Sequence, residues 1–149
     1  TYNYYRLVIE NIKTNDSDAL SLVVGNSGGY TTSGYYWSGS GVKSGSSLVT
    51  GGDNGSYWNL LGGSSSSYHT YSSGPTTGFI DFFDPYNSTH TSIAGTLSWK
   101  NGTSDNSHIN NVGGFISSAI SHTKWKLETI GSQTFSVGTV IRTYGVVKA

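Results

Sequence analysis

The sequence predicts an all-β fold: an antiparallel two-sheet β-sandwich, jelly-roll-like, of about eight to ten strands. Three observations predict it. Gly, Ser, Thr, Asn and Tyr dominate the composition, and these residues suit turns and strands better than helices. Short β-branched or aromatic runs recur between Gly, Asn, Asp and Ser. No helical segment is evident between these runs, so two packed sheets are the natural way to bury them. We expect residues 1–149 to form a single domain.

The first two strands are predicted at residues 4–12 (YYRLVIENI) and 19–24. The polar stretch "KTNDSD" between them has the composition of a turn, so we expect the two strands to form a hairpin.

Residues 25–75 are predicted to be irregular. "GYYWSGSG" at 34–41 and "GSYWNLLGG" at 55–63 each place aromatic residues beside glycines. The low-complexity stretch at 62–75 predicts an exposed loop or irregular edge.

Clear strand patterns return at 77–83, which Asp84-Pro85 ends, and at 92–100. Further strands are predicted at 114–120, 123–130 and 138–147. Alternation in these strands predicts Trp99 and Trp125 in the core. The first and last strands are long and apolar, so we expect them to be neighbours in one sheet.

Composition excludes several classes of site and partner. The chain has no cysteine, which removes disulfides, thiolate metal sites and cysteine nucleophiles. Eight basic and eight acidic residues give no net charge, and the basic residues are dispersed, which argues against nucleic-acid binding. No apolar run approaches the roughly 18 residues of a spanning helix, so no membrane insertion is expected.

The sequence predicts no metal site and no cofactor. The four histidines have no second histidine at metal-ligand spacing, and we expect them to be solvated loop residues. They are His69, His90, His108 and His122. "GDNGS" at 52–56 lacks the spacing of a calcium loop and favours a turn.

Candidate catalytic carboxylates are few. Asp81 and Asp84 are three residues apart on a predicted strand and therefore point to opposite faces, and Asp84 is better explained as a turn residue. Glu10 and Glu128 are further acids within predicted strands. We therefore expect no enzyme; a glycosidase-type carboxylate pair is the least favoured alternative.

An aromatic cluster in the first half of the chain is the main candidate binding or interface site. Exposed Tyr and Trp beside Ser and Asn make adaptable binding surfaces, which can stack on sugars or pack against another subunit. The alternative is that these rings fill the core where aliphatic residues are missing, and the sequence leaves both open. The residues are Tyr35, Tyr36, Trp37, Tyr57, Trp58, Tyr68 and Tyr71.

The two ends of the chain carry a resemblance. "Y-x-x-Y-R-L-V-I-E-N-I" covers Tyr2 and 5–12, "D-A-L-S-L-V-V" follows, and "F-x-x-G-T-V-I-R-x-Y-G-V" covers 135–146. These motifs resemble small virion structural proteins of tailed bacteriophages, in which a Tyr-rich first strand and a final strand bracket a β-sandwich. The resemblance implies a last strand that lies in the core, sealed by Tyr144, with Gly145 allowing a close approach.

The resemblance also implies a function. The expected protein is a non-enzymatic virion-surface component, a capsid decoration (cement) protein or a tail-fibre-type module, and is extracellular when released. Its partners are other virion proteins and itself, as a homo-oligomer such as a trimer. An edge strand at 140–147 that is left unpaired could also recruit partner strands. The main alternative is a carbohydrate-binding module for a host surface glycan, with Trp37 and Trp58 as stacking platforms.

Overall fold

A computed structural model describes residues 2, 4–15, 18–43, 48–61, 74–87, 89–100, 107–131 and 133–146, with the backbone alone at 43, 48–51 and 53. These residues form eleven strands and no helix. The strands are β1 (Tyr4–Ile12), β2 (Leu20–Asn26), β3 (Gly29–Tyr30), β4 (Tyr35–Lys43), β5 (Leu48–Gly55), β6 (Trp58–Asn59), β7 (Thr76–Phe83), β8 (Ser92–Lys100), β9 (Ser107–Ile116), β10 (Lys124–Thr129) and β11 (Val140–Val146).

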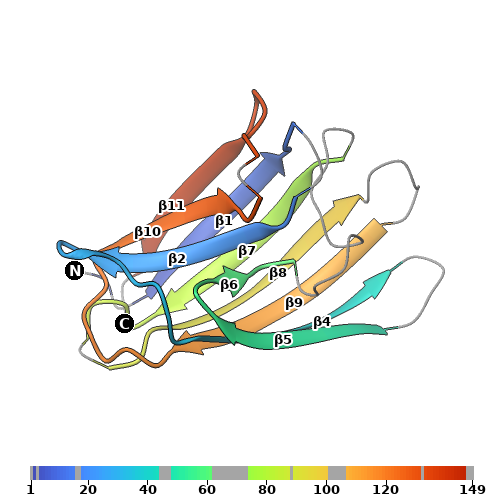
Figure 1. The fold of residues 1–149 in the computed structure, drawn as a ribbon. Helices are drawn as coiled ribbons and strands as arrows, with labels where there is room; N and C mark the ends of the chain where they lie inside the picture. The colour runs from blue at the N-terminus through green and yellow to red at the C-terminus, as the bar shows by residue number, and fades with distance from the viewer. Residues whose placement is uncertain are drawn as a thin grey trace.

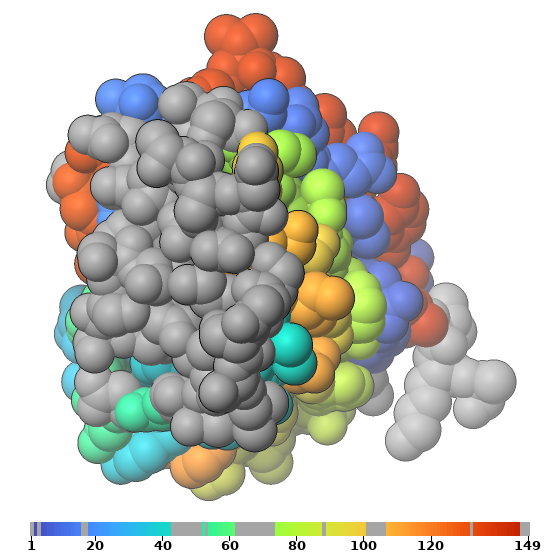
Figure 2. All heavy atoms as spheres, turned by 90° about the vertical axis from the view of Figure 1, so that its right-hand side faces the viewer, coloured from blue at the N-terminus to red at the C-terminus, as the bar shows by residue number. Residues whose placement is uncertain are grey.

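The strands form two antiparallel sheets that face each other (Figure 1). The large sheet has seven strands in the order β11-β1-β7-β8-β9-β4-β5. The small sheet has four: β10 pairs with one side of β2, and β3 and β6 pair with the other. Figure 2 shows part of the order of the large sheet as red, blue, green and orange bands from right to left. The predicted antiparallel sandwich is therefore confirmed, with sheets of unequal size.

The core lies between the two sheets. Alternate residues of β1, β7 and β8 point inward, so Leu7, Ile80 and Leu97 are fully buried on the large sheet. Leu20 and Leu22 of β2 are fully buried in the small sheet and belong to the same cluster. We call the face of the large sheet toward this core its inner face and the opposite face its outer face.

The predicted hairpin of the first two strands is wrong. β1 pairs with β11 and β7, whereas β2 belongs to the small sheet. The link between them crosses from one sheet to the other. Its polar residues bond to a distant segment: Thr14 bridges to Phe135, and the side chain of Asn15 accepts a bond from the Thr134 amide at 2.9 Å. A polar stretch of this kind can therefore form a link between two sheets as well as the tight turn of a hairpin.

Residues 25–75 are more regular than predicted. β4 and β5 pair with each other along most of their lengths, and β4 also pairs with β9. "GDNG" of the predicted turn is the end of β5. β4 is rich in Gly and Ser and β5 is rich in Gly, so cross-strand pairing, not local propensity, determines their conformation. Most of the predicted loop at 62–75 lies outside the described residues.

The predicted strand bounds differ most at β9. We expected a strand at 114–120, whereas β9 begins at Ser107 and ends at Ile116. Its first half alternates His, Asn and Val on one side with Ile and Asn on the other, a pattern without the apolar run that marks other strands.

The pairing of the first and last strands is confirmed, with Tyr4 opposite Val146 and Glu10 opposite Val140. However, β11 is an edge strand, and Tyr144 points to the outer face with 50% of its surface exposed. The expectation that Tyr144 seals the core is therefore wrong. Gly145 does allow a close approach, because a Cβ built there would lie 2.3 Å from the ring of Tyr2.

Candidate functional site

The predicted aromatic cluster is divided between the two faces of the large sheet. Tyr35 and Trp37 of β4 point inward, and Tyr36 between them points outward. Consecutive strand residues alternate between faces, so aromatic residues adjacent in sequence cannot form one surface. Tyr68 and Tyr71 lie outside the described residues.

Tyr35 and Trp58 are core residues, both 0% exposed. Their rings meet edge to face, with centroids 4.9 Å apart at 88°. The Tyr35 hydroxyl accepts a bond from the Val24 amide at 3.0 Å, and the Trp58 indole N–H donates to the Phe115 carbonyl at 3.3 Å. The expectation that these two residues form an exposed binding surface is therefore wrong, and Trp58 is not a stacking platform for a sugar.

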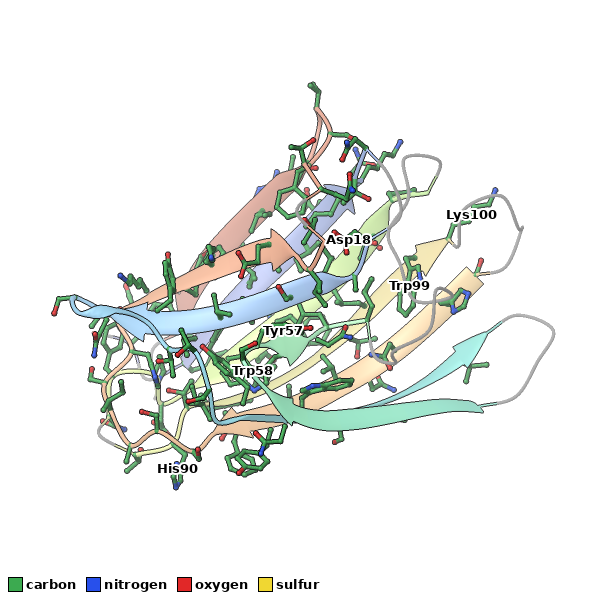
Figure 3. All side chains as sticks on the ribbon, in the orientation of Figure 1. Asp18, Tyr57, Trp58, His90, Trp99 and Lys100 are labelled. Atoms are coloured by element: carbon green, nitrogen blue, oxygen red, sulfur yellow. The ribbon has the colours of Figure 1, made fainter. Side chains whose placement is uncertain are left out.

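The other members differ in exposure. Trp37 and Tyr57 are partly buried against the core cluster. Figure 3 shows Tyr57 and Trp58 at β6, in front of the large sheet. Tyr36 is 38% exposed and stacks on Phe115 of β9, with centroids 4.9 Å apart and the rings within 10° of parallel. Of the described members, Tyr36 alone presents its ring on the outer face.

The predicted placement of the tryptophans in the core is confirmed for Trp99, which is 3% exposed. Trp125 is partly buried and packs against the core cluster.

Two of the histidines are not the solvated loop residues we expected. His108 lies in β9 and is buried, with its ring stacked on Trp99 at 5.0 Å. His122 is also buried, and its Nδ1 lies 2.8 Å from the Thr91 hydroxyl. His90 is exposed, near the end of the molecule opposite Trp99 (Figure 3). His69 lies outside the described residues. Among the described residues no three His, Asp or Glu side chains gather as a metal site would require.

The predicted separation of Asp81 and Asp84 is confirmed. Asp81 lies on the outer face in a bidentate ion pair with Arg6 of β1, with N–O distances of 2.7 and 2.8 Å. Asp84 is a turn residue with φ of 51°, and its carbonyl accepts a bond from the Asn87 amide. Burial raises the pKa of Asp81, but the bonds from Arg6 and Tyr4 and the charge of Arg6 outweigh it, so the pKa is lowered.

The other strand acids are also ion-paired. Glu10 pairs with Arg142 of β11, and Glu128 pairs with Lys126 two residues before it on β10, at 2.6 Å. Glu10 lies on the large sheet and Glu128 on the small sheet, and each binds a cation of its own or a neighbouring strand.

The Arg6–Asp81 pair predicts a dependence of stability on pH. Because folding lowers the pKa of Asp81, the stabilisation is present above the unfolded pKa of about 4 and is lost as the pH falls through the folded value. Asp81→Asn should remove about 1 kcal/mol at pH 7 and flatten the acid limb of the stability curve. Urea unfolding at a series of pH values measures this. Glu128→Gln, at the half-exposed pair, is the control, and an equal loss in both variants would contradict the assignment.

The open edge of the large sheet at β11 is the first candidate interaction surface. β11 pairs with β1 on one side, and among the described residues no strand pairs with its other side. Of its four side chains on the outer face, Val140 is partly buried, and Arg142, Tyr144 and Val146 are exposed. Arg142 is held by Glu10, which raises its pKa.

A cavity of about 270 Å³ is the second candidate site. It lies between the sheets, beside the two edge strands β10 and β11. Sequence analysis missed it because its residues come from six separate places in the chain. The lining residues are Tyr5, Val24, Phe82, Pro85, Tyr86, His122, Thr123, Lys124, Trp125 and Thr143.

A shallow depression on the outer face over β4, β5 and β9 is lined by small residues, among them Ser38, Ser40 and Gly113. The described residues that line it include no aromatic and no charged side chain.

No protein-family model, curated protein or solved structure matches the chain. In the ranges that the structure describes, no helix is long and apolar enough to cross a membrane.

Proposed function

We propose that this chain is a non-enzymatic structural module of a virus particle surface, and that it assembles with a second copy of itself through β11. The observation that carries the proposal is the open edge of the large sheet at β11, because an unpaired strand presents a row of backbone donors and acceptors to a partner strand.

β11 is the least protected of the three long edge strands. Natural edges are blunted by charges, prolines or irregularity. β10, with the sequence KWKLET, carries three charges, and β5, with LVTGGDNG, is rich in glycine and carries an aspartate. β11, with VIRTYGV, has mainly β-branched and aromatic residues and one charge, Arg142, which is already paired.

The sequence of β11 is compatible with two-fold pairing. If two copies pair antiparallel about Thr143, Arg142 of one copy lies opposite Tyr144 of the other, and Val140 lies opposite Val146. The arrangement places no like charges opposite each other, and it brings an arginine beside an aromatic ring at two symmetric positions. The resulting sheet would continue across both copies.

The virion location is supported by the two end motifs of the sequence. The segments that resemble phage structural proteins are Tyr2 with 5–12, then 18–24, and 135–146. They cover most of β1 and all of β11, which pair along their lengths, and most of β2 in the small sheet. The segments that carry the resemblance therefore contribute strands to both sheets of the sandwich. The ion pairs of Asp81, Glu10 and Glu128 suit a structural role, because each acid already has a cation partner.

A charge introduced at the proposed interface tests the assembly. Tyr144→Lys places a second cation opposite Arg142 of the second copy, twice in each two-fold dimer. We expect wild-type protein to approach twice the 15.8 kDa of one chain in light scattering over a concentration series. The variant should dissociate at concentrations at least about tenfold higher, a difference of about 1.4 kcal/mol.

Val42→Lys is the matched control. Val42 is exposed on the same face of the sheet, far from β11, with 58% of its surface accessible against 50% for Tyr144. The control should assemble like the wild type. A wild-type chain that stays monomeric at every concentration would refute the proposed pairing, as would equal weakening by both substitutions.

A further inference from the structure

One residue that lines the cavity between the sheets, His122, has a buried polar atom without a hydrogen-bond partner. His122 is 2% exposed, and its Nε2 makes no hydrogen bond. The rest of the residue is held firmly: Nδ1 lies 2.8 Å from the Thr91 hydroxyl, and the His122 amide donates to the Pro85 carbonyl at 2.6 Å. Buried polar atoms are nearly always paired, so Nε2 requires a partner that the described part of the chain does not supply.

The cavity is lined mainly by rings. Tyr5 and Phe82 come from the large sheet, Trp125 comes from the small sheet, and Tyr86 lies in the turn after β7. The rings of Tyr5 and Tyr86 are 5.7 Å apart, and a hydrogen bond with Tyr5, together with burial, raises the pKa of Tyr86. Tyr86 is 37% exposed, so the cavity reaches the molecular surface.

No charged group faces the cavity among its lining residues. Lys124 lines it, but its ammonium lies 4.6 Å above the ring of Tyr30 on the other side of the small sheet. Burial lowers the pKa of His122, so the imidazole is neutral at neutral pH. The hydroxyls of Tyr5, Tyr86, Thr123 and Thr143 are the remaining polar groups. The lining thus combines aromatic rings with neutral donors and acceptors.

We propose that this cavity binds one neutral hexopyranose ring, with a sugar hydroxyl hydrogen-bonded to Nε2 of His122. The apolar face of a pyranose packs on aromatic rings, and its hydroxyls use the tyrosine and threonine oxygens. A purely apolar ligand would leave Nε2 unpaired, and a charged one would find no counter-ion. The volume is at the small end of ligand sites, which suits one ring and not a chain of sugars.

This site is distinct from the aromatic cluster in the first half of the chain and does not depend on pairing through β11. Thr143 lines the cavity from the inner face, whereas Tyr144, the residue changed in the assembly test, points to the outer face.

The test is a titration of the ¹⁵N-labelled protein with the methyl glycosides of glucose, galactose, mannose and N-acetylglucosamine, followed by NMR. We expect one of them to bind with a millimolar or lower Kd, with shift changes concentrated at Tyr5, His122 and Trp125. The free hexoses are titrated in parallel. A methyl glycoside that binds at least as well indicates the terminal residue of a glycan, and a preference for the free hexose indicates a free sugar.

His122→Phe keeps a buried ring and removes the nitrogen, so it should weaken binding about tenfold. His90→Phe, at an exposed histidine that does not line the cavity, should bind as the wild type does. The chemical-shift changes of the wild-type protein locate the binding site even if His122→Phe does not fold. Three results would overturn the proposal: no glycoside binds, which leaves water as the partner of Nε2; the shifts map elsewhere; or phenol binds where every sugar fails.

Discussion

Trp58→Ala is expected to destabilise the protein by about 3–5 kcal/mol, the usual cost of removing a large buried aromatic side chain. The indole is 0% exposed, contacts the Tyr35 ring edge to face, and donates to the Phe115 carbonyl. Its removal leaves a cavity beside that ring and an acceptor without its donor. Small domains are stable by only about 5–15 kcal/mol, so this loss is a large part of the free energy of unfolding.

Denaturant unfolding followed by circular dichroism measures this loss, and Tyr36→Ala is the control. Tyr36 lies on the outer face, where its ring stacks on Phe115, so its loss should cost about 0.5–1.5 kcal/mol. Equal costs for the two substitutions would contradict the burial of Trp58. Loss of glycan binding in Trp58→Ala would have little meaning as evidence for a stacking platform, because the variant loses core packing.

The strands that could be predicted from sequence are those in which local pattern and pairing agree. β1 and β8 have the predicted bounds. β1 is a run of aromatic and aliphatic residues, β8 alternates Ile, Leu and Trp with small or polar residues, and a polar stretch rich in Asn, Asp and Ser follows each. β4 has Gly and Ser, and β5 has Gly, at most of the positions where other strands have β-branched residues, so these two strands are determined by pairing with their neighbours in the sheet. No window of the sequence contains that information, because the partner β9 is more than sixty residues away from β4.

The cavity could not be predicted for a related reason. Tyr5, His122 and Thr143 are brought together only because β1 pairs with β11 and the small sheet crosses above them. Each residue alone has an ordinary explanation: a strand tyrosine, a loop histidine, a strand threonine. The prediction of the aromatic cluster failed in the opposite way. Residues 35–37 are adjacent in sequence, but the alternation of β4 places them on opposite faces of the sheet. Spacing along the chain predicts a site only when the secondary structure is known.

The proposed assembly and the proposed sugar site use different residues of the same strand, β11. Residues of β11 that face outward would contact the second copy, and Thr143, which faces inward, lines the cavity. If both hold, sugar binding and assembly occur side by side at this edge of the sandwich. The Tyr144→Lys variant should then assemble at least about tenfold more weakly than the wild type and still bind the glycoside.

Gly78→Ala is expected to have an effect as large as that of Trp58→Ala. Gly78 lies in β7 between Ile9 of β1 and Leu97 of β8, next to the shift in register that separates Ile9 from Ile12. Its φ is +148°, and a Cβ there would lie 2.1 Å from the Thr96 carbonyl and 2.9 Å from Leu97. The backbone conformation costs about 1–3 kcal/mol for a residue with a Cβ, and the overlap costs about as much again.

Gly113→Ala is the matched control, because the nearest atom to its added Cβ is 3.8 Å away in an ordinary strand conformation. That variant should change the free energy of unfolding by no more than about 1 kcal/mol, because the added methyl group meets no close atom and alanine restricts the unfolded chain. Thermal or urea unfolding of both variants checks the contrast. Similar stabilities for the two would show that β7 and β8 are farther apart at Gly78 than the structure has them, and that the register of the large sheet is different at its centre.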